Sequence, residues 1–189
     1  MVAIDYFTKW VKVEAYNRIT EKKTTDFVWR NLVCRYGILY ALIADNDMQF
    51  DNHNLREFCQ NLRIELKFYS PSHPLFNGQV EAANKVIKRL LKTRLGEKNG
   101  AWVDELPEVL WAYKMSHKIA TGETLFALAF GHEAVVPAEI EATTHRTKHF
   151  NERDNNDHVY LNMDLLTEKR EVASKRLATY QQRVAHCYN

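Results

Sequence analysis

The order of strand-like and helix-like segments predicts an α/β fold for this 189-residue chain. Stretches rich in β-branched residues alternate with stretches whose apolar residues recur every three or four positions, which are the periods of strands and helices. This order favours a mixed sheet with helices packed on it. Strands are expected at residues 2–4, 11–15, 41–44 and 64–68, and helices at residues 24–35, 54–61, 79–95 and 103–117.

The expected strands differ in their apolar patterns. Residues 2–4 (VAI) are apolar and residues 11–15 (VKVEA) alternate with period two, so these two segments are expected to pair antiparallel. Residues 41–44 (ALIA) are apolar throughout, which is typical of a strand buried in the middle of a sheet. Residues 64–68 (IELKF) alternate again and indicate a further strand.

The expected helices are bounded by glycine and proline. Gly37 is expected to end the first helix, because glycine readily adopts the positive φ of a helix C-terminus. Residues 70–78 (SPSHPLFNG) contain two prolines and a glycine and predict a loop. The helix at 79–95 follows it, so Glu81 is expected in the first helical turn.

Three regions are expected along the chain. Residues 1–144 form one α/β domain, and the polar stretch 145–157 (HRTKHFNERDNND) forms a linker. In residues 158–189 apolar positions recur with alternating spacings of four and three, broken only at Arg170, which predicts one long amphipathic helix.

The composition is that of a soluble globular protein, with 46% apolar and 26% charged residues. No apolar run approaches the roughly 20 residues of a membrane span, and no signal peptide is apparent, so we expect a nuclear or cytoplasmic protein that is not secreted and has no membrane partner. The net charge of +2 does not by itself indicate nucleic-acid binding. The three cysteines include no C-x-x-C pair, so neither a disulfide framework nor a zinc site is expected.

Two acidic residues have the context of metal ligands. Asp45 directly follows the apolar strand, and a carboxylate at the end of such a strand lies at the sheet edge where α/β folds bind ligands. Glu81 lies on the next long helix. Phosphoryl transfer with paired Mg²⁺ needs carboxylates from separate elements. The alternative is that each is an ordinary solvated charge among 24 acidic residues.

The helix that carries Glu81 has a basic face. Lys85, Lys88 and Lys92 follow Glu81 along one side, whereas the apolar residues Val80, Ala83, Ile87, Leu90 and Leu91 fall on the other. Three lysines in line with a metal-binding carboxylate would suit a DNA backbone that runs past the site. The alternative is a solvated face with an internal Glu81–Lys85 pair that contributes about 0.3–0.5 kcal/mol.

The segments around both acids resemble those of integrases from Ty3/gypsy-type retrotransposons, particularly the plant ones, within the retroviral integrase family. The matching segments are DNDMQF from Asp45, HP at 73–74 and NGQVEAANK at 77–85, and 35 residues (46–80) separate Asp45 from Glu81, as in that family. The resemblance extends to the flanks, including DYFTKW at 5–10, LWAY at 110–113 and YQQR at 180–183.

The resemblance implies a ribonuclease-H-like fold and a polynucleotidyl transferase that binds Mg²⁺ or Mn²⁺. The implied reactions are DNA 3′-end processing and strand transfer, which together constitute DNA integration. Asp45 and Glu81 would be catalytic metal ligands, and Asn84, Lys85, Lys88 and Lys92 would contact DNA. The family also implies self-association of integrase cores.

Two departures from the family pattern bear on activity. The family's first acid lies on a strand before the one at residues 2–4, so that strand and its carboxylate are expected to be missing, and Asp5 is expected to cap a turn. The metal is then expected to bind weakly, with little or no strand transfer by this chain alone. Asp47 stands where the family has glycine, and a turn there is expected to call for positive φ.

Two functions outside catalysis are kept as alternatives. The chain could be a non-catalytic DNA-binding module, in which the lysines and not Glu81 matter. It could instead be an assembly module that acts through the helix at 159–187.

Overall fold

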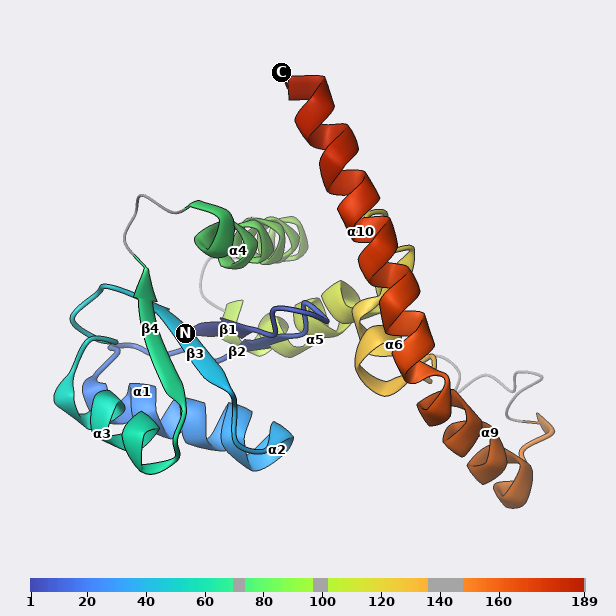
Figure 1. The fold of residues 1–189 in the computed structure, drawn as a ribbon, viewed down its shortest axis with the longest axis horizontal. Helices are drawn as coiled ribbons and strands as arrows, with labels where there is room; N and C mark the ends of the chain where they lie inside the picture. Colours follow the sequence, from blue (N-terminus) through green and yellow to red (C-terminus); the bar gives the residue numbers. More distant parts are fainter. Residues whose placement is uncertain (70–73, 97–101, 136–147, 189) are drawn as a thin grey trace. The chain divides into compact units, whose positions relative to one another are not determined.

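The computed structural model describes residues 1–69, 74–96, 102–135 and 148–188 (Figure 1). The chain divides into two compact units, and each is described by itself. Unit 1 contains residues 1–4 and 11–106, and unit 2 contains residues 5–10 and 107–189.

Unit 1 contains two separate pairs of strands. Strand β1 (Val2–Ile4) pairs antiparallel with β2 (Val11–Val13), as the sequence predicts. Strand β3 (Ala41–Asp45) pairs in parallel with β4 (Glu65–Tyr69). Among the described residues the two pairs are not joined by a ladder, so the predicted mixed sheet is divided into two-stranded sheets.

Both strand pairs cover the same helical layer. Buried residues of that layer lie on α1 (Glu21–Val28), the π-helical turn η1 (Trp29–Val33) and α3 (His53–Asn61). Ala3 of β1, Leu42 of β3 and Leu66 of β4 all pack against this core, which consists of Phe27, Val28, Val33, Leu55, Cys59 and Ile64.

Strand β3 is not buried in the middle of a sheet, and that prediction is wrong. Its residues are half-buried or exposed, and the side chain of Ile43 is 40% exposed. The physical reason is that, within the part of the chain that the structure describes, β3 has a partner strand on one edge only. An apolar strand in this position leaves β-branched surface in water, which costs free energy in proportion to its area.

The first helix begins earlier than predicted and is not uniformly α-helical. Its N-cap is Thr20, whose side chain accepts a hydrogen bond of 3.4 Å from the backbone N–H of Lys23. The π-helical turn η1 leads into α2 (Cys34–Tyr36). Gly37, with φ of 84°, ends the helix as expected.

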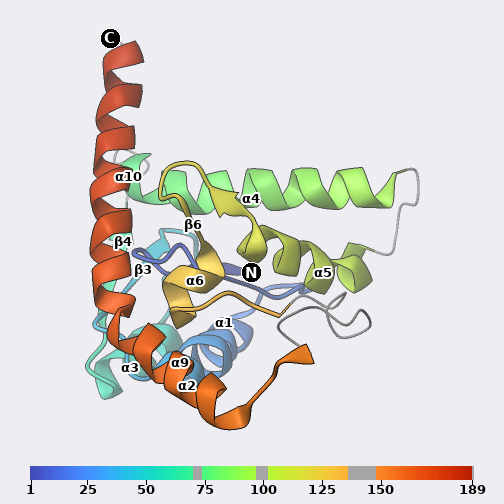
Figure 2. The ribbon, with the colours of Figure 1, turned by 90° about the vertical axis from the view of Figure 1, so that its right-hand side faces the viewer.

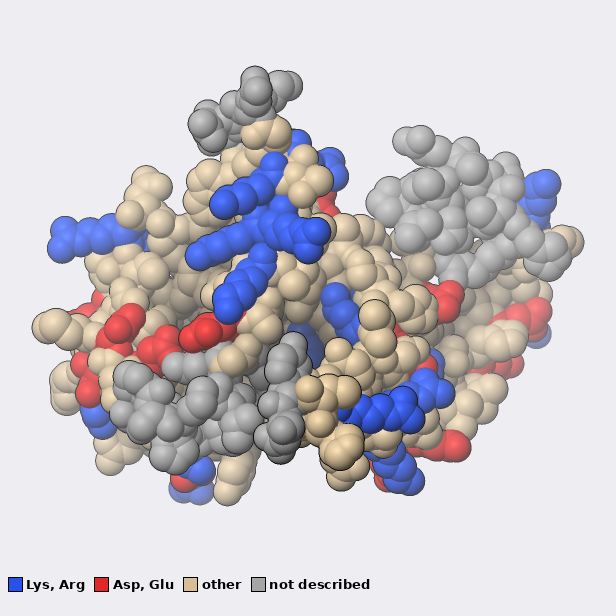
Figure 3. Space-filling view, turned by 90° about the horizontal axis from the view of Figure 1, so that it is seen from above, with Lys and Arg blue, Asp and Glu red and all other residues tan. Residues whose placement is uncertain are grey.

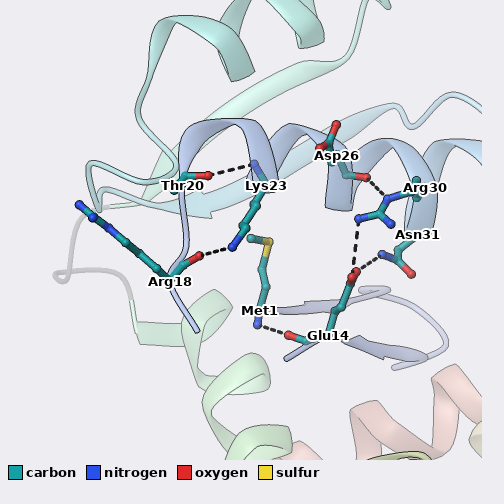
Figure 4. Close-up of polar contacts among 8 residues, drawn as sticks. All are labelled: Met1, Glu14, Arg18, Thr20, Lys23, Asp26, Arg30 and Asn31. Atoms are coloured by element: carbon teal, nitrogen blue, oxygen red, sulfur yellow. Dashed lines mark hydrogen bonds and ion pairs between the residues drawn. The ribbon is translucent and has the colours of Figure 1, made fainter. Parts of the chain in front are cut away.

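The β1–β2 hairpin is tied to the π-helical turn through Glu14 (Figure 4). The Glu14 carboxylate accepts a hydrogen bond of 2.9 Å from Asn31 and lies 3.6 Å from the guanidinium of Arg30. Its backbone carbonyl accepts a 2.6 Å bond from the amino group of Met1. Two consecutive residues of η1 therefore contact one carboxylate. Burial, together with this carboxylate, raises the pKa of Tyr16 to about 12.

Helix α4 (Pro74–Leu95) begins five residues before the predicted start. Proline is favourable at the first helical position because its fixed φ suits a helix and its missing N–H would be unpaired there. Ala83 and Ile87 of α4 are 3% and 4% exposed, and the helix contacts β1. Helix α5 (Trp102–Met115) follows, and the division between the units falls within it at Pro107.

Unit 2 contains elements that the sequence did not predict. The short strands β5 (His117–Lys118) and β6 (Glu123–Thr124) form a hairpin that leads into α6 (Leu125–Phe130). The ring of Trp10 lies 5.2 Å from that of Phe130 and 6.2 Å from that of Phe126, which links the turn at 5–10 to α6.

The predicted single helix at 158–189 is two helices (Figure 2). Helix α9 (Glu152–Asp164) and helix α10 (Leu166–Tyr188) are separated at Leu165. Helix α9 begins inside the predicted linker 145–157, because the side chain of Asn151 accepts hydrogen bonds from the backbone N–H groups of Arg153 and Asp154 and caps the helix there. The predicted boundary at residue 144 lies outside the described residues.

Helix α10 is held against α6 by polar contacts. Lys169 donates a 2.7 Å hydrogen bond to the carbonyl of Gly131, and Arg170 donates to the carbonyls of Leu128 and Ala129 at 2.9 and 3.2 Å. These bonds satisfy carbonyl groups that the end of α6 leaves without a helical partner. Among the described residues no helix is long and apolar enough to cross a membrane.

Candidate metal and nucleic-acid site

Asp45 is the last residue of β3 and is exposed. Its position in the ladder is opposite Tyr69, the last residue of β4. Because β3 and β4 are parallel, their carboxyl ends meet at one edge, about 4.8 Å apart. Asp45 thus lies at the end of the predicted apolar strand, although it belongs to the strand and the strand is not buried as expected.

Glu81 is brought towards this edge by the connection from β4 to α4. Helix α4 begins five residues after Tyr69, and five residues span at most about 18 Å. In Figures 1 and 2 the carboxyl ends of β3 and β4 point towards the N-terminal end of α4. Glu81 is exposed but is the eighth residue of α4, so its expected place in the first turn is wrong.

The two acids are the type of ligand that a magnesium ion prefers, but they are fewer than the three carboxylates that the integrase resemblance implies. Carboxylate oxygens are the ligands that Mg²⁺ prefers. The part of the chain that the structure describes contains no group of three His, Cys, Asp or Glu side chains placed to hold a metal ion. His73, in the segment before α4, lies outside the described residues.

Asp5 serves the hairpin turn, as expected. One oxygen of its carboxylate accepts hydrogen bonds from the backbone N–H and the hydroxyl of Thr8, at 2.7 and 2.5 Å. Its backbone N–H donates to the carbonyl of Trp10. Lys9 in the same turn has φ of 59°, and burial lowers its pKa while the nearby Asp5 charge raises it.

The expectation that Asp47 needs a left-handed backbone is wrong. Among the described residues other than glycine, only Lys9 and Arg63 have positive φ. The carbonyl of Asp47 instead accepts hydrogen bonds from the backbone N–H groups of Phe50 and Asp51, and its carboxylate accepts one of 3.1 Å from Gln49. A turn closed in this way accommodates ordinary residues, so the aspartate fits without strain.

Basic side chains line the exposed face of α4. Figure 3 shows lysine and arginine side chains gathered over this helix. Lys85, Lys88 and Lys92 are exposed as predicted, and Asn84 is half-buried. Sequence reasoning missed Arg89, which is also exposed and lies four residues after Lys85. The Glu81–Lys85 ion pair of the alternative interpretation is not among those formed by the described residues, whereas the solvated face itself is not excluded by the exposure of these side chains.

Positive charge is concentrated on this helix. Residues 82–96 contain five Lys and Arg residues and no Asp or Glu, although the whole chain has a net charge of only +2. Arg94 is paired with Glu105 of α5, and the other four basic side chains form a face that suits a polyanion next to a metal site.

Comparison with known proteins places the chain beside transposon polyproteins. No family model matches it. It is 26% identical over 148 residues to the Transposon Tf2-3 polyprotein of Schizosaccharomyces pombe (strain 972), and equally to the Tf2-4 polyprotein. The match covers 77% of this chain but 11% of each polyprotein, so the chain spans about a tenth of the curated relatives' length.

Solved structures share its fold. It matches a chain of the simian T-cell lymphotropic virus intasome in complex with PP2A regulatory subunit B56 gamma, with TM-score 0.61 and 21% identity, over 72% of this chain and 49% of that one. It matches the BIV integrase catalytic core domain (TM-score 0.57, 23% identity, 67% and 82% covered). It also matches the HTLV-2 integrase catalytic core domain in complex with magnesium (0.54, 23%, 66% and 80%). The chain therefore shares the fold of these integrase catalytic core domains, as the resemblance implies, whereas the missing first strand stays a prediction.

Proposed function

We propose that this chain is part of an integrase catalytic core that carries out metal-dependent DNA 3′-end processing and strand transfer. The observation that carries the proposal is the placement of Asp45 at the carboxyl end of β3, beside the strand that leads directly into the helix of Glu81 and the exposed lysines. The fold shared with integrase cores and the sequence similarity to Tf2 polyproteins support it. An origin in a plant retrotransposon remains a prediction.

Asp45 and Glu81 would be the catalytic metal ligands contributed by this chain. When bound, Mg²⁺ or Mn²⁺ would stabilise the attacking and leaving oxygens of a phosphodiester displacement. Asp45 is exposed at the end of β3, and Glu81 is exposed on α4. Both side chains are therefore accessible to an ion and to DNA. With two carboxylates the binding would be weak, because each lost ligand lowers affinity for a hard cation.

A third carboxylate would come from a strand outside these 189 residues. Strands β1 and β3 cover the same helices without pairing to each other, and Ile43 is 40% exposed. We place the additional strand between their open edges, where it would cover Ile43 and complete one mixed sheet. Without that strand, little or no strand transfer is expected.

The exposed face of α4 would hold the DNA. Lys85, Lys88 and Lys92, with Asn84 beside them, follow Glu81 along the helix and would contact successive phosphates. Arg89 extends the same surface and adds a guanidinium, which can donate two hydrogen bonds to one phosphate.

An oligonucleotide-joining assay with Mn²⁺ tests the catalytic proposal. The 189-residue chain is compared with a longer polyprotein segment that includes the preceding sequence. We expect joining only by the longer protein, abolished by Asp45→Asn and by Glu81→Gln. Asp47→Asn removes a carboxylate two residues from Asp45 and serves as the matched control that retains joining. Robust joining by the 189-residue chain would refute the need for another strand, and joining that survives Asp45→Asn would refute the role of Asp45.

A non-catalytic DNA-binding module is the second candidate. It is favoured by the absence of a three-ligand group among the residues that the structure describes. It predicts that even the longer protein binds duplex DNA without joining it, and that Glu81→Gln leaves binding unchanged.

Self-association of cores is a further part of the proposal. The HTLV-2 integrase catalytic core domain has been solved in trimeric and dimeric forms, which concerns that protein. Light scattering of this chain with and without residues 155–189 would show whether it associates and whether α9 and α10 are needed, as the helix-mediated assembly alternative requires.

A further inference from the structure

The C-terminal part of α10 is a second helix segment without acidic residues. Residues 172–188 contain Lys175, Arg176 and Arg183 and no Asp or Glu. Together with residues 82–96 of unit 1, this segment holds eight of the 26 Lys and Arg residues. The remaining 18 are outnumbered by 24 Asp and Glu residues, so the rest of the chain is net negative and positive charge is segregated onto two helices.

The three basic side chains of this segment are exposed and lie on one face. At 100° per residue, Lys175, Arg176 and Arg183 fall within an arc of about 100°. The other residues of the segment on this arc are Thr179 and His186, which are polar and exposed, and Val172, which is apolar and 41% exposed. Among the described residues no ion pair engages any of the three basic side chains.

The basic face is mounted on a helix that the rest of unit 2 holds in place. Ala173 is buried at 3% exposure, and Leu177 is half-buried one turn later. The bonds from Lys169 and Arg170 to the end of α6 fix the first turns of α10. The guanidinium of Arg176 lies close against Gly122, where a Cβ would come within 2.6 Å of its Nη1.

We propose that Lys175, Arg176 and Arg183 form a second nucleic-acid surface, in unit 2, which contacts the phosphate backbone of a duplex. Arg176 and Arg183 are seven residues apart, so they lie on one line along the helix about 10 Å from each other. Charged donors spaced along an exposed helix suit a row of phosphates. This surface is independent of Asp45 and Glu81 and does not require catalysis.

The apolar side of α10 argues against a membrane as the occupant. An interfacial helix buries a continuous apolar face in lipid. On α10 that face is occupied through Leu177 by unit 2 itself, which leaves only Tyr180 (44% exposed) and Val184 (38% exposed) of the described apolar positions along this line. Two side chains separated by one turn are too little for insertion, whereas charge is available along the whole segment.

The test measures duplex DNA binding by the 189-residue chain as a function of salt. The variant Lys175→Gln, Arg176→Gln, Arg183→Gln is compared with the matched control Lys22→Gln, Arg35→Gln, Arg153→Gln, which removes the same charge from exposed positions elsewhere. Three lost phosphate contacts should reduce the slope of log K against log salt by about 2.7, which corresponds to binding weakened roughly 500-fold at 0.1 M salt relative to 1 M salt. The control should retain the wild-type slope.

Binding to vesicles of phosphatidylserine and phosphatidylcholine tests the alternative that the surface contacts a membrane. The proposal would be overturned if the three substitutions weakened binding to vesicles but left binding to duplex DNA unchanged. An unchanged salt slope in the α10 variant, with helical content preserved by circular dichroism, would also overturn it. Glu81→Gln leaves this surface intact, so failure of the proposed catalytic function is distinguishable from failure of the α10 surface.

Discussion

Helices α4 and α10 present similar basic faces but are anchored in different ways. Helix α4 buries Ala83 and Ile87 in unit 1, so apolar burial fixes its orientation. In α10 only Ala173 is fully buried among the described side chains, and Lys169 and Arg170 anchor it by hydrogen bonds to backbone carbonyls. A helix with a basic face can thus be attached by hydrophobic packing or by polar contacts, and substitutions in the two helices should change the free energy of unfolding by different amounts.

The largest expected effect is the difference in stability between substitutions in α4 and in α10. Ile87→Ala on α4 should lower the free energy of unfolding by about 2–4 kcal/mol, because it removes buried methyl groups and leaves a cavity. Val184→Ala on α10 should change it by less than about 0.5 kcal/mol, because Val184 is 38% exposed. Urea denaturation followed by circular dichroism measures both, and equal losses would show that the helices are packed alike.

Two glycines, one in each unit, are expected to differ in how strongly an alanine substitution lowers stability. Gly96 ends α4 and Gly131 ends α6, and both have positive φ. A Cβ at Gly96 would meet no atom of the described residues within 4 Å, whereas at Gly131 it would lie 2.7 Å from the carbonyl oxygen of Asn162 in α9. Gly96→Ala should therefore cost only the backbone strain, about 1 kcal/mol.

Gly131→Ala should cost about 2 kcal/mol or more, because backbone of α9 must also move. Thermal unfolding of the two variants checks the difference. If Gly131→Ala were no worse than Gly96→Ala, the close packing of α6 against α9 would be contradicted.

The sequence predicted elements well where a pattern of side chains determines the local structure. Alternation gave the β1–β2 hairpin, and the apolar stripe of α4 correctly assigned Ala83 and Ile87 to the buried side. Its errors concern partners in space. The pattern of β3 is that of a central strand, but whether it is central depends on neighbouring strands that periodicity cannot reveal.

The sequence predicted which elements carry Asp45 and Glu81, but not the helical turn that holds Glu81. Asp45 was placed by the strand before it, and Glu81 by the resemblance around it. The early start of α4 at Pro74 was missed because the loop-like residues before Gly78 were judged by composition, whereas a proline can begin a helix. The break at Leu165 was missed because the apolar spacing continues across it, so only the cap at Asn151 could have indicated a separate α9.

Neutralising the α4 face tests whether the two surfaces act alike. Lys85→Gln, Lys88→Gln, Lys92→Gln should reduce the salt slope by about 2.7, which corresponds to duplex binding weakened roughly 500-fold at 0.1 M salt relative to 1 M salt. Combination with the α10 variant should give the sum of the two slope changes, because the substitutions lie in separate units and share no partner. If the combined variant had the same slope as one of the two triple variants, only the helix changed in that triple variant would contact DNA.

The smallest expected effect concerns the polar anchor of α10. Arg170→Met keeps much of the side chain's length but removes its bonds to the carbonyls of Leu128 and Ala129, and should cost about 1 kcal/mol because the site is half-exposed. Amide exchange should become faster in α10 and remain unchanged in α4. Lys175→Met, at an exposed position of the same helix, is the matched control.

The same variant connects the anchor with the basic face. If polar capping orients α10, Arg170→Met should weaken duplex binding by more than the single charge that it removes, because Arg176 and Arg183 would no longer be held on a fixed line. Lys22→Met removes one charge from an exposed position outside both basic faces and gives the reference value. Equal weakening by the two variants would show that α10 contributes charge alone, and that its attachment to α6 serves only the stability of unit 2.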